Sequence, residues 1–199
     1  SVDLIFTLQE NILVSDVVIE GNTVIPSSEL TPFVSSLKGL PQNLNEINKS
    51  IEQINDYYHQ KGYILETISS VDDNSNGILT IVINEGIINK ITFSGNEKTK
   101  QYVIERNTIT REGEVYNEEN LKKDLVKIYA TQIFDKVDRE IKPSEENKGT
   151  YDVNVIVKEK VSNNVAVGGG IDSGIGVFGS VAIHENNFRG AGQKLSLSG

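Results

Sequence analysis

The stretch of this sequence that most resembles a metal-binding site lies between residues 72 and 77. Asp72-Asp73-Asn74-Ser75-Asn76-Gly77 places oxygen donors at alternate positions and Gly sixth, as in the first half of a calcium-binding loop. Such a loop needs a bidentate Glu at its twelfth position, where this chain has Ile83, and it needs flanking helices. We therefore predict a hairpin turn here and no metal site.

Other residue types that carry chemistry are sparse. His59 and His184 are the only 2 histidines, too few and too separated for a His-based metal site, and the chain has 0 cysteines. Gly168-Gly169-Gly170 is not followed by the Lys that a phosphate-binding loop requires. Glu118-Glu119 falls in the predicted first turn of a helix, where carboxylates favour the positive helix end. We predict no catalytic residues, no cofactor and no enzyme.

Composition excludes further classes of function. The net charge is -9 and the isoelectric point is near 4.8, so the chain repels phosphate backbones and we expect no nucleic-acid partner. A hydrophobic content of 37% with 24% charged residues is typical of a globular protein. No apolar run is long enough for a membrane-spanning helix.

The chain repeats itself. The alternating apolar pattern of residues 14–22 ends in Gly21-Asn22, and the same pattern returns in residues 88–96, which end in Gly95-Asn96. Tyr58-His59-Gln60-Lys61-Gly62-Tyr63 aligns with residues 129–134 in the same way. These matches indicate two copies with a period of roughly 71 to 75 residues.

Each copy predicts a β-α-α-β-β unit. In the first, strands are expected at residues 14–20, 63–71 and 78–85, with helices at 27–37 and, capped by Asn43, from Leu44 to the Gly62 stop. Residues 78–85 are apolar on both faces, which predicts a central strand. The second copy places its strands at 88–94, 134–142 and 150–159 and its helices at 98–107 and 117–131.

These patterns predict domains at residues 12–85 and 86–160, with different segments on either side. Val2, Leu4, Phe6 and Leu8 alternate with polar residues, so we expect residues 1–11 to be the last strand of a preceding repeat. The chain has 0 methionines, and we expect its natural start to lie upstream.

The last segment, residues 161–199, differs in composition, because 9 of the 17 glycines fall in the last 40 residues. Extended segments are expected at 164–170, at 175–185 and from 193. Their length and weak alternation are typical of transmembrane β-strands. One face of the second segment carries Ile175, Val177, Val181 and Ile183, and the other carries Phe178, Ser180, Ala182 and His184.

Together these features resemble the polypeptide-transport-associated (POTRA) repeats and first barrel strands of BamA-like outer-membrane assembly proteins. The resemblance is carried by the β-α-α-β-β order, the two Gly-Asn signatures, the Glu85-Gly86 junction and residues 185–193, which look like the family's first periplasmic turn. It implies an α+β fold of tandem POTRA domains, each with two helices on a three-stranded mixed sheet, followed by a truncated transmembrane β-barrel segment.

The same resemblance implies a function. Such proteins lie in the outer membrane with their repeats, here residues 1–160, in the periplasm. They receive unfolded outer-membrane proteins and accessory assembly subunits, and they contact outer-membrane lipid through the barrel. Two alternatives remain open: a two-partner secretion or autotransporter-assembly barrel, and a purely structural periplasmic scaffold.

In the family's POTRA sheet the final strand is central, which leaves the middle strand of each copy at an edge. An edge strand exposes unpaired N–H and C=O groups to which an unfolded client can add as an extra strand. The candidate edge residues of the first copy are Tyr63, Ile64, Leu65, Glu66, Thr67, Ile68 and Ser69, and those of the second are Phe134, Lys136, Val137 and Arg139. We expect the first edge to be the main site, because charged residues are denser along the second.

Overall fold

A computed structural model describes residues 10–161, 163–174 and 176–198. It divides into two compact units, one of residues up to Ile87 together with Val115–Glu118, and one of Ile88–Glu114 together with Glu119–Gly199. The strand expected at residues 1–11 falls almost entirely outside the described residues. The two described residues of that segment, Glu10 and Asn11, are not in a strand.

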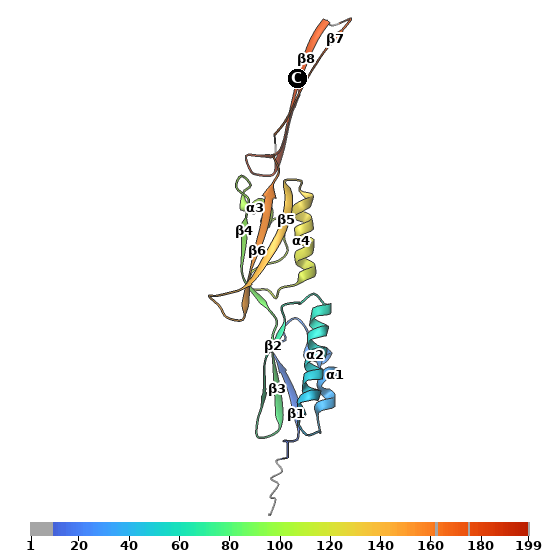
Figure 1. Ribbon diagram of the computed structural model, residues 1–199, viewed down its shortest axis with the longest axis vertical. Helices are drawn as coiled ribbons and strands as arrows, with labels where there is room; N and C mark the ends of the chain where they lie inside the picture. Colours follow the sequence, from blue (N-terminus) through green and yellow to red (C-terminus); the bar gives the residue numbers. More distant parts are fainter. Residues whose placement is uncertain (1–9, 162, 175, 199) are drawn as a thin grey trace, which may run out of the picture. The chain divides into compact units, whose positions relative to one another are not determined.

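The first unit is a three-stranded mixed sheet with helices on one face (Figure 1). Its elements are β1 (Asp16–Glu20), α1 (Ser27–Val34), the short 3-10 helix η1 (Ser35–Leu37), α2 (Leu44–Gln60), β2 (Thr67–Asp73) and β3 (Ile78–Asn84). β3 lies between a parallel β1 and an antiparallel β2, which confirms that it is the central strand.

The core of this unit follows from the apolar spacing of its elements. Alternate residues of β3, Leu79, Ile81 and Ile83, are buried against the helices. Ile54 and Tyr58 meet them from α2 and are fully buried, as expected for one apolar stripe on a solvated helix. The Asn43 side chain accepts hydrogen bonds from the backbone N–H groups of the first helical turn and caps α2 as predicted.

The second unit repeats the order β-α-α-β-β. It contains β4 (Ile87–Ser94), α3 (Gln101–Glu105), α4 (Glu118–Ala130), β5 (Phe134–Pro143) and β6 (Thr150–Glu159), with the sheet order β4-β6-β5. Val103 and Ile104 of α3 and Ile128 of α4 share one core with Val155 and Val157 of β6, so both helices pack on the same face. α3 is shorter than the predicted helix at 98–107: the backbone N–H groups of Lys98 and Thr99 donate to Glu159, and residues 106–107 form a turn.

The Gly-Asn signature has the same structural cause in both units. Gly21 and Gly95 have φ of +85° and +86°, and a Cβ there would lie 2.1 and 1.8 Å from the carbonyl oxygens of Ile83 and Val157. Only glycine fits a positive φ so close to the central strand. Asn22 and Asn96 then donate to the carbonyl three residues ahead, at 2.9 and 3.0 Å.

The acidic residue that ends each central strand has a matching role. The Glu85 carboxylate accepts the N–H groups of Thr23 at 2.7 Å and Val24 at 3.0 Å. The Glu159 carboxylate likewise accepts the N–H groups of Lys98 at 3.1 Å and Thr99 at 2.6 Å. Burial raises the pKa of Glu159, but hydrogen bonds from the Thr99 side chain and from these N–H groups lower it by more, so its pKa lies below the usual value. The repeated Glu therefore ties the loop after the first strand to the centre of its sheet.

The remaining strands form an antiparallel meander of β7 (Asn163–Asp172), β8 (Gly176–Phe188) and β9 (Gln193–Ser198). β8 runs to Phe188, so the turn predicted at 185–193 is shorter than expected, and Ile175 lies outside the described residues. The register pairs Val165 with Ile183 and Val167 with Val181. Since paired residues share a face, the predicted apolar and polar faces of β8 extend across the β7–β8 pair.

Candidate strand-addition edges

The candidate edge of the first unit is the free side of β2. The sheet order β1-β3-β2 places β2 at an edge, as predicted, and within the described residues no strand pairs with its other side. The strand begins at Thr67, however, so only Thr67, Ile68 and Ser69 of the seven candidate residues belong to it. Tyr63, Ile64, Leu65 and Glu66 lie in the turn between α2 and β2, and their assignment to the strand was wrong.

Packing onto the end of α2 explains why these four residues are not in the strand. The backbone N–H of Tyr63 donates to the Tyr58 carbonyl at 3.1 Å, and its ring meets the Tyr58 ring edge-on at 6.0 Å. Glu66 donates its N–H to the Tyr63 carbonyl and is only 2% exposed. The residues whose types suggested a strand therefore form the turn that packs against the end of α2.

The usable edge of β2 is short and shaped by a bulge. The pairing with β3 shifts between Ile68 and Ser70, and the Ser69 hydroxyl donates to the Val82 carbonyl at 3.1 Å. The strand ends in exposed Asp72 and Asp73, beyond which the 74–77 turn leads to β3. A bulge and terminal charges are common on natural edge strands, because they limit uncontrolled association.

That turn is the stretch that resembled half of a calcium loop. Asn74 Oδ1 accepts the backbone N–H groups of Asn76 and Ile78, both at 3.0 Å, and the turn joins the antiparallel strands β2 and β3. The side-chain oxygen therefore supports a hairpin, as predicted. Within the described residues, no group of three or more His, Cys, Asp or Glu could hold a metal ion.

A buried acidic cluster lies directly before β2. The Glu66 carboxylate is enclosed, with the Asn55 amide oriented to donate to both of its oxygens at 3.2 Å and His59 Nε2 3.6 Å from Oε2. Burial, assisted by the nearby negative charge of Glu85, raises the pKa of Glu66 to about 7. Glu85 in turn accepts the Tyr58 hydroxyl at 2.7 Å. Burial and this bond raise the pKa of Tyr58.

The candidate edge of the second unit is β5. Phe134, Lys136, Val137 and Arg139 all belong to this strand, which lies at the edge of the order β4-β6-β5. Phe134 is 1% exposed and Val137 packs on the core, so these two side chains face inward. Lys136 is exposed, and the bulge between Phe134 and Lys136 interrupts the pairing. Among the strands that the structure describes, none pairs with the outer edge of β5, and the outward-facing side chains of β5 are charged.

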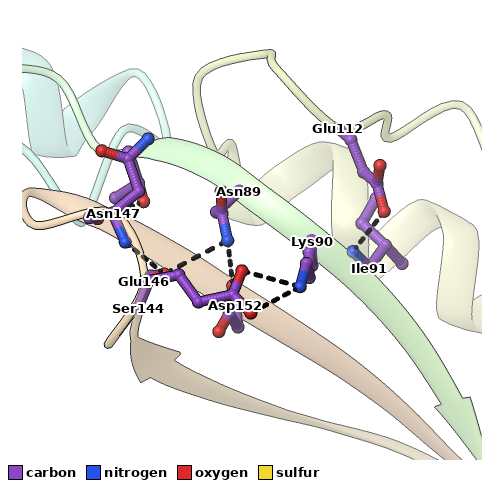
Figure 2. A network of polar contacts seen from close by, with 9 residues as sticks. Asn89, Lys90, Ile91, Glu112, Ser144, Glu146, Asn147 and Asp152 are labelled. Atoms are coloured by element: carbon purple, nitrogen blue, oxygen red, sulfur yellow. Dashed lines mark hydrogen bonds and ion pairs between the residues drawn. The ribbon is translucent and has the colours of Figure 1, made fainter.

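The opposite edges, β1 and β4, were not among the edges predicted from the sequence. A three-stranded sheet with a central final strand has two edges, so the predicted topology already contained this signal. At β4, the backbone N–H of Ile91 donates to Glu112 Oε1 at 2.9 Å, an interaction visible in Figure 2. Glu112 is 21 residues away in a loop, and neither its role nor its position could be inferred from periodicity.

The two histidines do not form a metal site together. His59 borders the Glu66 cluster and His184 lies in β8, so the structure does not bring them to one site. Among the residues described, no helix is both long enough and apolar enough to cross a membrane.

Comparison with known families identifies both repeats. Residues 12–86 match the family described as "POTRA domain, ShlB-type", and residues 87–160 match "Surface antigen variable number repeat", also named POTRA. Each match covers one complete β-α-α-β-β unit of the sequence.

Curated relatives extend the match over most of the chain. The chain is 28% identical to Outer envelope protein 80, chloroplastic, of Oryza sativa over 98% of its own length and 31% of that protein. It is 29% identical to Outer membrane protein assembly factor BamA of Nitratidesulfovibrio vulgaris over 72% of its own length and 19% of that protein. The chain therefore spans less than a third of the length of these relatives.

Solved structures share the fold. POTRA1-3 of the periplasmic domain of Omp85 from Anabaena superposes with a TM-score of 0.69 at 23% identity, over 75% of this chain and 66% of that one. CdiB from Escherichia coli gives a TM-score of 0.70 at 21% identity, over 96% of this chain and 36% of that one.

Proposed function

Since this chain belongs to the Omp85/BamA family and contains two of its POTRA domains, we propose that the β2 edge receives extended segments of unfolded outer-membrane proteins by strand addition. Members of this family are assembly factors and not enzymes. In this proposal residues 1–160 lie in the periplasm of an outer-membrane protein. Accessory assembly subunits use the same domains.

The observation that carries this proposal is the position of β2 at the edge of its sheet, beside the central β3. A backbone edge binds through main-chain N–H and C=O groups, which every client possesses, so affinity requires little sequence information. Ile68 and Val71 pack against the core and hold the strand in place, while Thr67 and Ser69 are exposed. Such an edge suits an acceptor of many different β-rich segments.

The charge along the two edges favours β2 over β5. The residues from Thr67 to Val71 carry no charge, whereas β5 contains Asp135, Lys136, Asp138, Arg139, Glu140 and Lys142. A client strand placed beside β5 must match these alternating charges or desolvate them, which costs free energy. β5 is therefore the more selective, secondary edge.

We further propose that β7, β8 and β9 are the first strands of a transmembrane β-barrel. Their apolar face is exposed to an extent unusual for a soluble sheet: Val167 is 77% and Val177 83% exposed. The opposite face carries Ser180 and His184, as expected for strands with lipid on one side and a polar lumen on the other. Outer-membrane lipid is then a partner of this segment.

Two-partner secretion is the second candidate function. It is favoured by the first domain's match to the ShlB-type POTRA family, by a relative named Hemolysin transporter protein ShlB that is 35% identical over 81 residues, and by the likeness to CdiB. In that case the β2 edge receives a single exported partner instead of many clients. A scaffold without any client contact is the third alternative.

Single cysteines test the proposal, because the chain contains 0 cysteines of its own. Thr67→Cys places a thiol on β2, and Thr80→Cys places its control on the central strand β3. Each variant is mixed with an unfolded outer-membrane barrel protein that carries one cysteine per strand, under mild oxidation. We expect disulfide trapping at position 67 at least fivefold above position 80.

The outcomes separate the alternatives. If trapping is equally low at positions 67 and 80 with every unfolded barrel protein, the client-capture hypothesis is wrong and the structural-scaffold alternative is favoured. Efficient trapping of one exported protein, with no trapping of barrel proteins, would support two-partner secretion.

A further inference from the structure

The outer edge of β4 in the second unit is closed over its first half and open over its second half. The Ile88 N–H donates to the Glu114 carbonyl and the Gly113 N–H donates to the Ile88 carbonyl, both at 2.8 Å. Residues 113–114 thus occupy the edge beside Ile88. From Ile91 onward a pocket of about 470 Å³ replaces this backbone pairing.

The pocket has an apolar wall and a polar wall. Ile91 and Phe93 line it from β4, and Glu105, Thr108, Arg111 and Glu112 line it from α3 and the loop after it. Residues two apart on a strand direct their N–H groups to the same side, so the N–H of Phe93 faces this edge together with that of Ile91. The pocket therefore contains backbone groups that an added strand could use.

The Glu112 side chain already occupies the position of an incoming carbonyl. Its Oε1 accepts the Ile91 N–H at 2.9 Å, which is the bond that a neighbouring strand would make (Figure 2). Glu112 is exposed, so water can replace its carboxylate at little cost. The interaction protects an edge donor without sealing the edge.

The other side of β4 is firmly held. Asn89 Nδ2 donates to Ser144 Oγ at 3.1 Å and to Asp152 Oδ1 at 3.0 Å, and Lys90 Nζ lies 2.7 Å from a Glu146 carboxylate oxygen (Figure 2). These bonds tie β4 to β6 and to the turn before it. An added strand would therefore meet a fixed template.

The charges of the pocket indicate which segment fits. The Arg111 guanidinium donates through Nη1 to the Thr108 hydroxyl and to the Thr110 carbonyl, so it is engaged with the wall. Glu105 and Glu112 supply two carboxylates to the rim. A matching segment places apolar side chains against Ile91 and Phe93 and a Lys or Arg beside these carboxylates.

We propose that this β4 edge is a second strand-addition site, selective for an extended segment that alternates apolar residues and carries a Lys or Arg. On binding, the segment's carbonyl accepts the Ile91 N–H and Glu112 pairs with the incoming cation. This inference extends the proposed capture of unfolded chains to a second place and a defined chemistry. Strand addition at the β4 edge does not require strand addition at the β2 edge.

Disulfide trapping on the full chain tests the site with peptides of known sequence. Thr92→Cys puts a thiol on β4, and Ile156→Cys puts its control on the central strand β6. The probe is a ten-residue peptide of alternating Val and Thr with one Cys and a central Lys, and its twin has Glu for Lys. We expect the Lys peptide to be trapped at position 92 at least fivefold above position 156, and about threefold above the Glu peptide, as for an exposed ion pair.

Glu112→Gln keeps an acceptor for the Ile91 N–H and removes the charge, so it should abolish the preference for Lys over Glu while trapping persists. Trapping at position 67 but not at position 92 would overturn this inference and leave the β2 proposal standing. Trapping at position 92 but not at position 67 would support the β4 site and overturn the β2 proposal. An undiminished Lys preference in Glu112→Gln would overturn the role of Glu112.

Discussion

The Asn187 side chain donates a hydrogen bond to the Thr99 hydroxyl across 2.7 Å, joining two residues 88 positions apart. Asn187 is 3% exposed, and its Oδ1 accepts the Gly192 N–H at 2.9 Å. The Lys100 N–H donates to the Gly190 carbonyl at 2.9 Å, and Lys98 and Glu185 form an ion pair. The turn after β8 is therefore seated on residues 98–100, the loop that Glu159 anchors to β6.

A double-mutant cycle measures this contact. Asn187→Ala removes the Asn187 bonds to the Thr99 hydroxyl and to the Gly192 N–H, so we expect a loss of about 2 kcal/mol in unfolding free energy. Thr99→Val removes the same bond together with the Thr99 side-chain bond to Glu159, and the two substitutions should couple by about 1 kcal/mol. Urea unfolding of the full chain in micelles, followed through the methyl NMR signals of Val103 and Ile104, gives these values. Strictly additive losses would contradict a direct bond.

The strand-ending acids provide a matched pair. Glu85→Gln replaces an acceptor of the Thr23, Val24 and Tyr58 donors with an amide that accepts through one atom only, so we expect a loss of about 3 kcal/mol. The Glu159→Gln change should cost about half as much, because Glu159 is less buried and has fewer donors. Each change should affect only its own unit. Equal losses in both units, from either variant, would contradict this role.

Acidification should stabilise the first unit through Glu66. Its pKa is about 7 when folded against 4.5 as the ordinary value, so the folded state binds the extra proton between these values. The contribution is full below pH 4.5 and is lost as the pH rises through about 7. The shift bounds it at about 3 kcal/mol, and a protonated His59 beside Glu66 would reduce it.

The measurement is urea unfolding between pH 5 and 8, followed at the methyl groups of Ile54 and Ile81. Glu66→Gln keeps the side chain's size and its acceptor for Asn55 and cannot ionise, so it should flatten the dependence. Parallel pH profiles for the native chain and Glu66→Gln would show that this carboxyl does not titrate in the window.

The alternating faces of β8 predict opposite effects at adjacent positions. Val181→Lys places a charge on the apolar face, which costs about 2 to 4 kcal/mol at the middle of a bilayer, so vesicle binding should fall at least tenfold. Ser180→Lys is on the other face and should bind nearly as well as the native chain. Flotation with phosphatidylcholine vesicles measures both. Equal binding by the two variants would contradict a lipid-facing side.

The sequence by itself determined the repeat, the β-α-α-β-β order and the central position of the final strand, because these depend on the local period of apolar residues and on capping residues such as Asn43. The Gly-Asn signatures were also visible, since a positive φ restricts the residue type at Gly21 and Gly95. These features arise from neighbours in the chain.

Only the tertiary structure decided where the edges begin and which groups protect them. Residues 63–66 have the composition of a strand, yet the burial of Glu66 and the Tyr58–Tyr63 contact place them in a turn. The bond from Ile91 to Glu112 and that from Asn187 to Thr99 join residues far apart in the chain. No local pattern encodes such contacts, because a side chain's partner across the fold depends on how whole elements pack.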